Sequence, residues 1–150
     1  ALRGSHCSLQ TLELGGNNVG REGAMALAEA LRSNCSLRTL NLSSNNLGLE
    51  GVAALGKALG SNHTLETLML HSNRIGDQGA VELAQVLRSK CSLKELGLWF
   101  NDISDTGAVP LVEALKSNQA FKALDLQFNR RIGSPTKCAV GEAAQDWVTL

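Results

Sequence analysis

The chain has no tyrosine and only five aromatic residues, two tryptophans and three phenylalanines, in 150 positions. Lysine and arginine together number 14, as do aspartate and glutamate, so the formal net charge is zero. A neutral chain has no long-range attraction for nucleic acid or an anionic membrane. No apolar run approaches the roughly 20 residues that a transmembrane helix needs. We therefore expect a soluble protein that binds neither nucleic acid nor membranes.

Leucine, in contrast, is abundant, with 26 copies beside 15 glycines. Five apolar residues recur at intervals of 28 residues: Leu9, Leu37, Leu65, Leu93 and Phe121. The positions that follow each of them repeat as well, so that Leu12, Leu14 and Asn17 return as Leu40, Leu42 and Asn45. A fixed period of this length predicts stacked structural repeats. We expect one repeat domain over residues 1–150, with units starting near 9, 37, 65, 93 and 121.

Within each unit the apolar spacing changes, and the change separates a strand from a helix. Leu12 and Leu14 alternate as on one face of a strand, whereas Gly23, Leu27 and Leu31 fall on one stripe of a helix. One unit cannot bury its own apolar face, so the units stack. Strands pair about 4.8 Å apart while helices need roughly 10 Å, so the strands take the inner side. The prediction is a right-handed α/β solenoid, a horseshoe with a parallel sheet on its concave face and helices on its convex face.

An asparagine follows every strand, at the point where the chain leaves the sheet. Backbone N–H and C=O groups that are buried where the chain leaves the sheet would lack hydrogen-bond partners. A side-chain amide can supply them, because it both donates and accepts hydrogen bonds. We therefore interpret this column as a structural ladder. Its members are Asn17, Asn45, Asn73, Asn101 and Asn129.

The pattern L-x-x-L-x-L-x-x-N-x-[VIL] in 28-residue units, from residue 9 to about 133, resembles the leucine-rich repeats of the ribonuclease-inhibitor type. The uniform period and the S-N-x-S/T-L connectors are similar to the repeat tails of NOD-like innate immune receptors. This resemblance implies a cytoplasmic module that binds proteins without catalysis, as a ligand-sensing or autoinhibitory tail. The partner would be another protein or another domain of the same parent chain.

The N-terminal residues match the end of a later helix. Residues 2–9 read like residues 31–37 with one insertion, and there is no initiator methionine. We expect the sequence to be a fragment of a longer array, with an exposed repeat face at its N-terminus.

The last unit departs from the pattern, because Arg131 is inserted before Ile132. Ser134 and Pro135 suit an N-cap and a first helical residue. We expect residues 134–150 to form a degenerate helix that caps the core, since terminal repeats are usually atypical. The predicted core stripe of that helix is Val140, Ala144, Trp147 and Val148. A partner-binding tail is the alternative interpretation.

No motif predicts catalysis, a cofactor or a metal. Residues 51–58 fit the spacing of a phosphate-binding loop, but they fall inside a helix. Neighbours in the column of Cys7, Cys35, His63 and Cys91 lie about 5 Å apart, so the four cannot converge on one tetrahedral ion. We expect free thiols, and His71 has no acid placed to orient it. We predict that the chain is not an enzyme.

The outward-facing columns of the sheet are free to bind a partner. They read Thr11, Thr39, Thr67, Glu95, Ala123; then Glu13, Asn41, Met69, Gly97, Asp125; then Gly15, Ser43, His71, Trp99, Gln127; and at the exit edge Gly16, Ser44, Ser72, Phe100, Phe128. Three of the five aromatics fall together here, and aromatics anchor protein interfaces. The predicted partner-binding residues are Met69, His71, Arg74, Trp99, Phe100, Asp102, Gln127, Phe128 and Arg130. Packing of the two phenylalanines into the exit loops is the structural alternative.

Two other functions are compatible with repeats of this kind. The GTPase-activating protein for Ran has similar helical repeats and acts through exposed loop residues at the solenoid edge. The corresponding positions here are Asn18, Asn46, Arg74, Asp102 and Arg130. An enzyme inhibitor resembling ribonuclease inhibitor is the other alternative.

Overall fold

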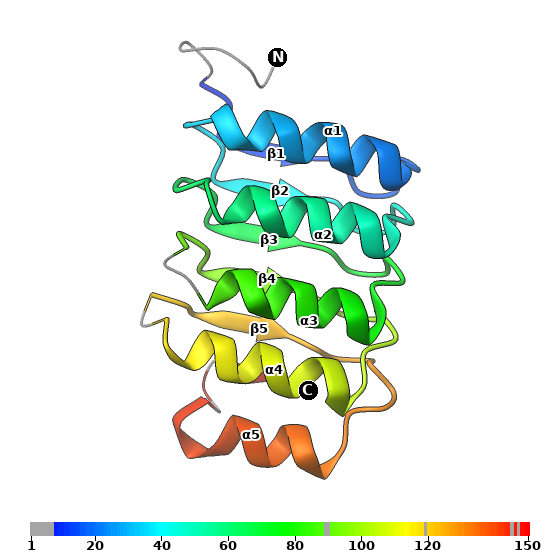
Figure 1. The fold of residues 1–150 in the computed structure, drawn as a ribbon, viewed down its shortest axis with the longest axis vertical. Helices are drawn as coiled ribbons and strands as arrows, with labels where there is room; N and C mark the ends of the chain where they lie inside the picture. The colour runs from blue at the N-terminus through cyan, green and yellow to red at the C-terminus, as the bar shows by residue number, and fades with distance from the viewer. Residues whose placement is uncertain (1–7, 89–90, 119, 145, 147) are drawn as a thin grey trace.

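The computed structural model describes residues 8–88, 91–118, 120–144, 146 and 148–150, in which strands and helices alternate (Figure 1). The strands are β1 (Thr11–Glu13), β2 (Thr39–Asn41), β3 (Thr67–Met69), β4 (Glu95–Gly97), β5 (Ala123–Asp125) and β6 (Val148–Thr149). The helices are α1 (Gly20–Ser33), α2 (Gly48–Leu59), α3 (Gly76–Leu87), α4 (Asp105–Lys116) and α5 (Ser134–Ala144).

The strands form one parallel sheet in the order of the sequence, β1 to β6. From β1 to β5 the pairing follows the repeat: Thr11 lies opposite Thr39, and Thr39 opposite Thr67. Figure 1 shows the helices stacked in one layer and the strands in a second layer behind them. The predicted α/β solenoid is therefore confirmed. We call the outward side of the sheet the strand face, and the opposite side the helix face.

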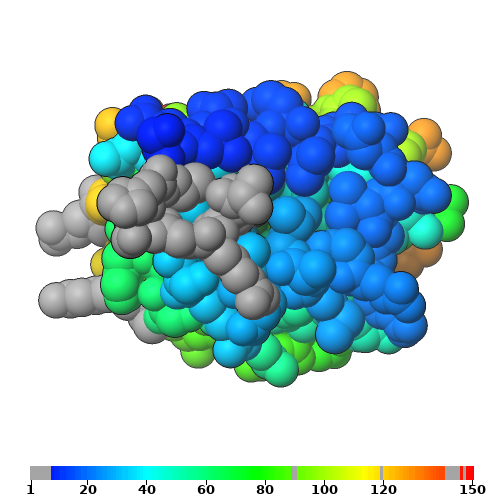
Figure 2. All heavy atoms as spheres, turned by 90° about the horizontal axis from the view of Figure 1, so that it is seen from above, coloured from blue at the N-terminus to red at the C-terminus, as the bar shows by residue number. Residues whose placement is uncertain are grey.

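The core lies between the two layers and consists mainly of the repeated leucines. Leu37, Leu40 and Leu42 are fully buried, as are Leu65 and Leu70. In the first repeat Leu9 remains 41% exposed, because no earlier repeat covers it in the described residues. Figure 2 views the molecule from this end, where the first repeat forms much of the surface.

An asparagine in the connector after α2 ties the end of that helix to the repeat before it. The Asn62 side-chain oxygen accepts hydrogen bonds from the backbone N–H groups of Thr64 and Leu65, and its amide donates to the carbonyls of Leu31 and Asn34 in the previous repeat. The S-N-x-S/T-L connector is thus a turn that also joins two repeats.

The start of each late helix is tied to the repeat before it by an aspartate. The Asp105 Oδ1 atom accepts hydrogen bonds from the backbone N–H groups of Gly133 and Thr136 and from the Thr136 hydroxyl. Asp77 accepts similarly from the backbone N–H and hydroxyl of Ser104. Helix α5 begins at Ser134, so Ser134 is a helical residue and not the predicted N-cap, and the Thr136 N–H donates to Asp105 instead.

The C-terminal residues correct a second prediction. Helix α5 ends at Ala144, and Val148 and Thr149 form β6 beside β5 instead of continuing a helix to residue 150. The backbone N–H of Leu126 donates to the carbonyl of Thr149 at 2.8 Å, so β6 supplies acceptors that β5 needs at its edge. Val148 is buried, as expected, but from a strand. Trp147 lies outside the described residues.

Candidate functional site

The loops that leave the sheet are held by the asparagine column. The Asn73 Oδ1 atom accepts hydrogen bonds from the backbone N–H groups of Asn45 and Leu47, and its amide donates to the carbonyls of Leu42 and Leu70. Asn73 is fully buried, so these bonds satisfy backbone groups that water does not reach. The same contacts recur at Asn45, Asn101 and Asn129, whereas Asn17 is exposed at the N-terminal end.

The residue before each ladder asparagine has a left-handed backbone. The φ angles in this column are positive, at 71°, 56°, 54°, 53° and 56° for Gly16, Ser44, Ser72, Phe100 and Phe128. Three of these residues are small, but the last two are phenylalanines, and a bulky side chain is rare in this region because its Cβ crowds the backbone. Two phenylalanines therefore occupy positions where the backbone favours glycine.

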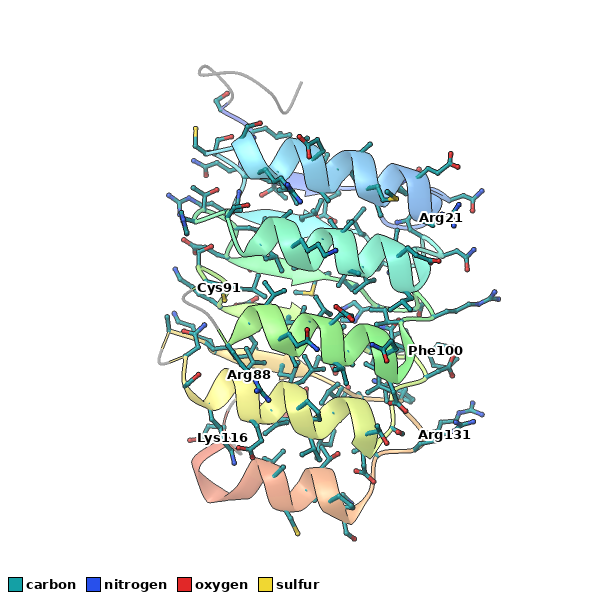
Figure 3. All side chains as sticks on the ribbon, viewed as in Figure 1. Arg21, Arg88, Cys91, Phe100, Lys116 and Arg131 are labelled. Carbon is teal, nitrogen blue, oxygen red and sulfur yellow. The ribbon has the colours of Figure 1, made fainter. Side chains whose placement is uncertain are left out.

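These phenylalanines meet Trp99 on the surface. The ring centroid of Trp99 lies 5.4 Å from that of Phe128 and 5.8 Å from that of Phe100. Phe100 is 48% exposed and Phe128 64% exposed, which argues against the alternative that they serve only as loop packing. Figure 3 shows Phe100 at the edge where the loops lead into the helices, on the same side as Arg21 and Arg131.

His71 completes this group, which we call the aromatic patch: His71, Trp99, Phe100 and Phe128. Its ring lies edge-on to Trp99 at 6.0 Å, and its Nδ1 atom accepts a hydrogen bond from the Trp99 backbone N–H at 3.2 Å. Partial burial lowers the pKa of His71 from its ordinary value of 6.5, and the negative charge of Asp125 opposes this effect. A neutral imidazole suits the geometry, because only a ring nitrogen without a proton can accept from Trp99.

A glycine in β4 makes room for His71. A Cβ added at Gly97 would lie 2.7 Å from the His71 Nε2 atom and 2.7 Å from the Met69 sulfur, so both side chains lie over this strand only because no side chain stands there. Beside them the strand face has a shallow hollow of about 110 Å³. It is lined by Met69, His71, Glu95, Leu96, Gly97, Ala123 and Asp125.

The structure places the predicted binding residues in two groups. Met69, His71, Trp99, Phe100 and Phe128 lie on the strand face and its exit edge. Arg74, Asp102, Gln127 and Arg130 are exposed, and the three charged residues among them belong to no ion pair among the described residues.

Sequence reasoning did not select Glu95, Gly97 and Asp125, although their columns place them on the strand face. The excess of acid over base in those columns was the available signal. Sequence reasoning also did not identify Asp125 as a neighbour of His71, although its charge raises the pKa of that residue.

The remaining predictions from the sequence concern the cysteines, metal binding and membrane-spanning helices. Cys35, Cys91 and Cys138 are free thiols, and Cys7 lies outside the described residues. Over the described ranges, no three potential metal-ligating side chains gather into a site. No helix in those ranges is long and apolar enough to cross a bilayer.

Comparison with protein families gives one match, the family model described as leucine rich repeat. It matches four times, at residues 5–28, 33–56, 61–84 and 89–112. The chain belongs to the leucine-rich repeat family. Leucine-rich repeats are typically scaffolds for protein interaction, which agrees with the expectation of a binding module.

A solved structure shares the fold of this leucine-rich repeat chain. It is described as leiomodin-1 actin-binding site 2, with a TM-score of 0.76 and 17% sequence identity, over 91% of this chain and 79% of that one. At this identity the likeness shows the fold alone. Among curated proteins, no sequence matches this one.

Proposed function

We propose that this leucine-rich repeat chain is a non-catalytic recognition module that binds a polypeptide partner through the aromatic patch on its strand face. The observation that carries the proposal is the grouping of three of the chain's five aromatics around Trp99, with Phe100 and Phe128 48% and 64% exposed. Tryptophan is enriched among the residues that dominate binding energies, and phenylalanine is enriched in protein interfaces.

Energetics favour a binding role for these rings over a role in folding. Each phenylalanine leaves about half or more of its surface in water. Each also occupies a left-handed backbone position that costs an ordinary side chain roughly 1 kcal/mol. Strained residues that contribute little to the core are found at functional sites. A partner that covers the rings would recover their apolar surface at about 25 cal/mol per Å².

The test uses capture of a partner by the intact chain and by two variants. Trp99→Ala and Phe128→Ala are expected to abolish capture and to leave the melting temperature nearly unchanged. Met25→Ala is the matched control, because Met25 is 50% exposed on α1 at the opposite, helix face. Equal binding by Trp99→Ala and the intact chain would refute the proposal.

Actin is the first partner to test, because the solved neighbour is described as an actin-binding site. Co-sedimentation with filaments and binding to monomers each give a direct readout. Capture that depends on Trp99 would identify the partner, and no capture would direct the search to other proteins.

We further propose that the chain is the sensing or autoinhibitory tail of a cytoplasmic NOD-like receptor. The support is the uniform 28-residue period and the S-N-x-S/T-L connector, whose asparagine joins successive repeats. The test adds the nucleotide-binding module of such a receptor in trans. Binding that is lost in Trp99→Ala supports this role, and no binding argues against it.

A further inference from the structure

The hollow beside the aromatic patch has acidic walls. Glu95 and Asp125 stand on adjacent strands, β4 and β5, two residues apart along the sheet. From strand geometry their Cα atoms lie roughly 8 Å apart. The floor is Gly97, and Met69 and Ala123 supply apolar surface on either side.

Neither carboxylate is neutralised within the described part of the chain. Glu95 accepts one hydrogen bond, from the Thr67 hydroxyl at 3.4 Å, through its Oε2 atom. The Asp125 Oδ1 atom accepts from the Gln127 N–H at 2.9 Å and from the Thr149 hydroxyl at 3.4 Å. One oxygen of each group therefore has no hydrogen-bond donor there, and neither group belongs to an ion pair.

The basic side chains near the start of these strands do not supply the missing charge. Arg38 and Lys94 both pair with Glu66, at 2.6 and 2.7 Å, and Lys122 forms no ion pair with either wall of the hollow. His71 faces the hollow as a neutral acceptor toward Trp99. The hollow therefore has a local excess of negative charge in a chain whose net charge is zero.

We infer that this hollow receives an arginine or lysine side chain of the bound polypeptide, beside the segment that covers the aromatic patch. The methylene stem would lie on Met69 and Ala123, and the cationic end would meet the free oxygens of Glu95 and Asp125. Long basic side chains combine apolar contact and charge in this way. A volume of about 110 Å³ suits the end of one unbranched side chain, and the two carboxylates disfavour an acidic or purely apolar one. This inference rests on the proposed function and specifies its partner.

The experiment selects short random peptides displayed on phage against the intact chain and counter-selects them against Trp99→Ala. Enriched peptides that require Trp99 are expected to share one arginine or lysine. In a synthetic copy, replacing that arginine by citrulline, which keeps the shape and removes the charge, is expected to weaken binding about tenfold or more. Glu95→Gln and Asp125→Asn are expected to weaken the arginine peptide similarly and to leave the citrulline peptide unaffected.

Glu50→Gln is the matched control, because it removes a carboxylate from α2 on the helix face. Both Gln at 95 and Asn at 125 keep a side-chain oxygen, so the hydrogen bonds from Thr67 and Gln127 retain an acceptor.

The results of this experiment distinguish a failure of the inference from a failure of the proposed function. Peptides that require Trp99 but lack a basic residue, or that tolerate citrulline, would overturn the inference and leave the proposed function standing. No peptide that requires Trp99 would overturn the proposed function and the inference with it. Equal weakening of the arginine peptide by Glu50→Gln would show a general charge effect and would also overturn the inference.

Discussion

The backbone N–H of Trp99 donates a hydrogen bond to Nδ1 of His71, 28 residues earlier in the chain, at 3.2 Å. The bond joins two repeats at the centre of the aromatic patch, where the Trp99 ring contacts both phenylalanines. It requires that Nδ1 carry no proton, so the arrangement of the patch is linked to the protonation state of one histidine.

The first prediction is that a fall in pH lowers the free energy of unfolding and disturbs the arrangement of the aromatic patch. Burial lowers the pKa of His71 below its ordinary 6.5, so the unfolded chain takes up the proton first as the pH falls. The contribution of neutral His71 to stability is present above about pH 6.5 and is lost as the pH falls through the folded-state pKa. Urea unfolding between about pH 8 and pH 5 measures it.

The control is His71→Gln, which does not titrate and can still accept a hydrogen bond. The difference in free energy of unfolding between the intact chain and this variant should shift in favour of the variant as the pH falls. NMR titration of the His71 ring gives the folded-state pKa directly. A midpoint at or above 6.5 would contradict the prediction.

The second prediction concerns Gly97. An added methyl group would lie 2.7 Å from the His71 Nε2 atom and the Met69 sulfur, so Gly97→Ala should displace both side chains and break the bond to Trp99. We expect a loss of about 1 kcal/mol in stability, as for modest overpacking, and a changed Trp99 amide signal by NMR.

Gly15→Ala is the matched control on the same face, because its nearest heavy atoms would be an ordinary 3.7 Å away. It should keep or slightly raise stability, since alanine restricts the unfolded chain. Equal behaviour of the two variants would show that Gly97 does not make room for His71.

The fold could be predicted from sequence because every repeat carries the same spacing of apolar residues and therefore requires the same strand pairing. Leu12, Leu40 and Leu68 can share one buried layer only if their strands pair in register, and the structure pairs them so. The position of Trp99 on the strand face follows from the same periodicity.

What the repeat did not specify is set by contacts between particular side chains. The role of Gly97 depends on the direction of the His71 ring, which spacing does not determine. The cap on α5 comes from Asp105, one repeat away, and Val148 pairs with β5 although its spacing also fits a helix. Departures from the repeat were therefore the hardest to predict.

The third prediction tests the asparagine ladder. Asn73→Ala removes an acceptor for two backbone N–H groups and a donor to three carbonyls, of which those of Leu70 and His71 keep another donor. Leaving such groups without partners should cost about 3 to 5 kcal/mol in urea unfolding. Asn17→Ala, at the exposed end of the same column, should change stability by about 0.5 kcal/mol or less. A similar loss in both variants would mean that burial does not set the ladder's contribution.

The fourth prediction concerns the C-terminal helix at low pH. The Thr136 hydroxyl, with the N–H groups of Gly133 and Thr136, holds the pKa of Asp105 below its ordinary 3.8. The contribution of the ionised Asp105 carboxylate to stability is therefore present above about pH 3.8 and is lost as the pH falls through its folded-state pKa. The protection factor of the Thr136 amide, its intrinsic exchange rate divided by the observed rate, should therefore fall over that range.

In Asp105→Ala the Thr136 amide should have a low protection factor at every pH. In Asp105→Asn, which keeps an acceptor oxygen, the protection factor should be higher and should not change with pH. An intact chain whose Thr136 exchange follows only the intrinsic dependence on pH would rule out the carboxylate as the cap.

The last prediction separates the contributions of Phe128 to stability and to binding. Asparagine tolerates the left-handed backbone better than phenylalanine, so Phe128→Asn relieves strain and exposes no core. Its free energy of unfolding should stay level or rise by up to about 1 kcal/mol, while partner capture is lost. Met25→Asn, at a site that is 50% exposed in a regular helix, should lose about 0.5 kcal/mol and keep binding. If Phe128→Asn lost 1 kcal/mol or more, its ring would be packing that the fold needs, and the strain would have no functional meaning.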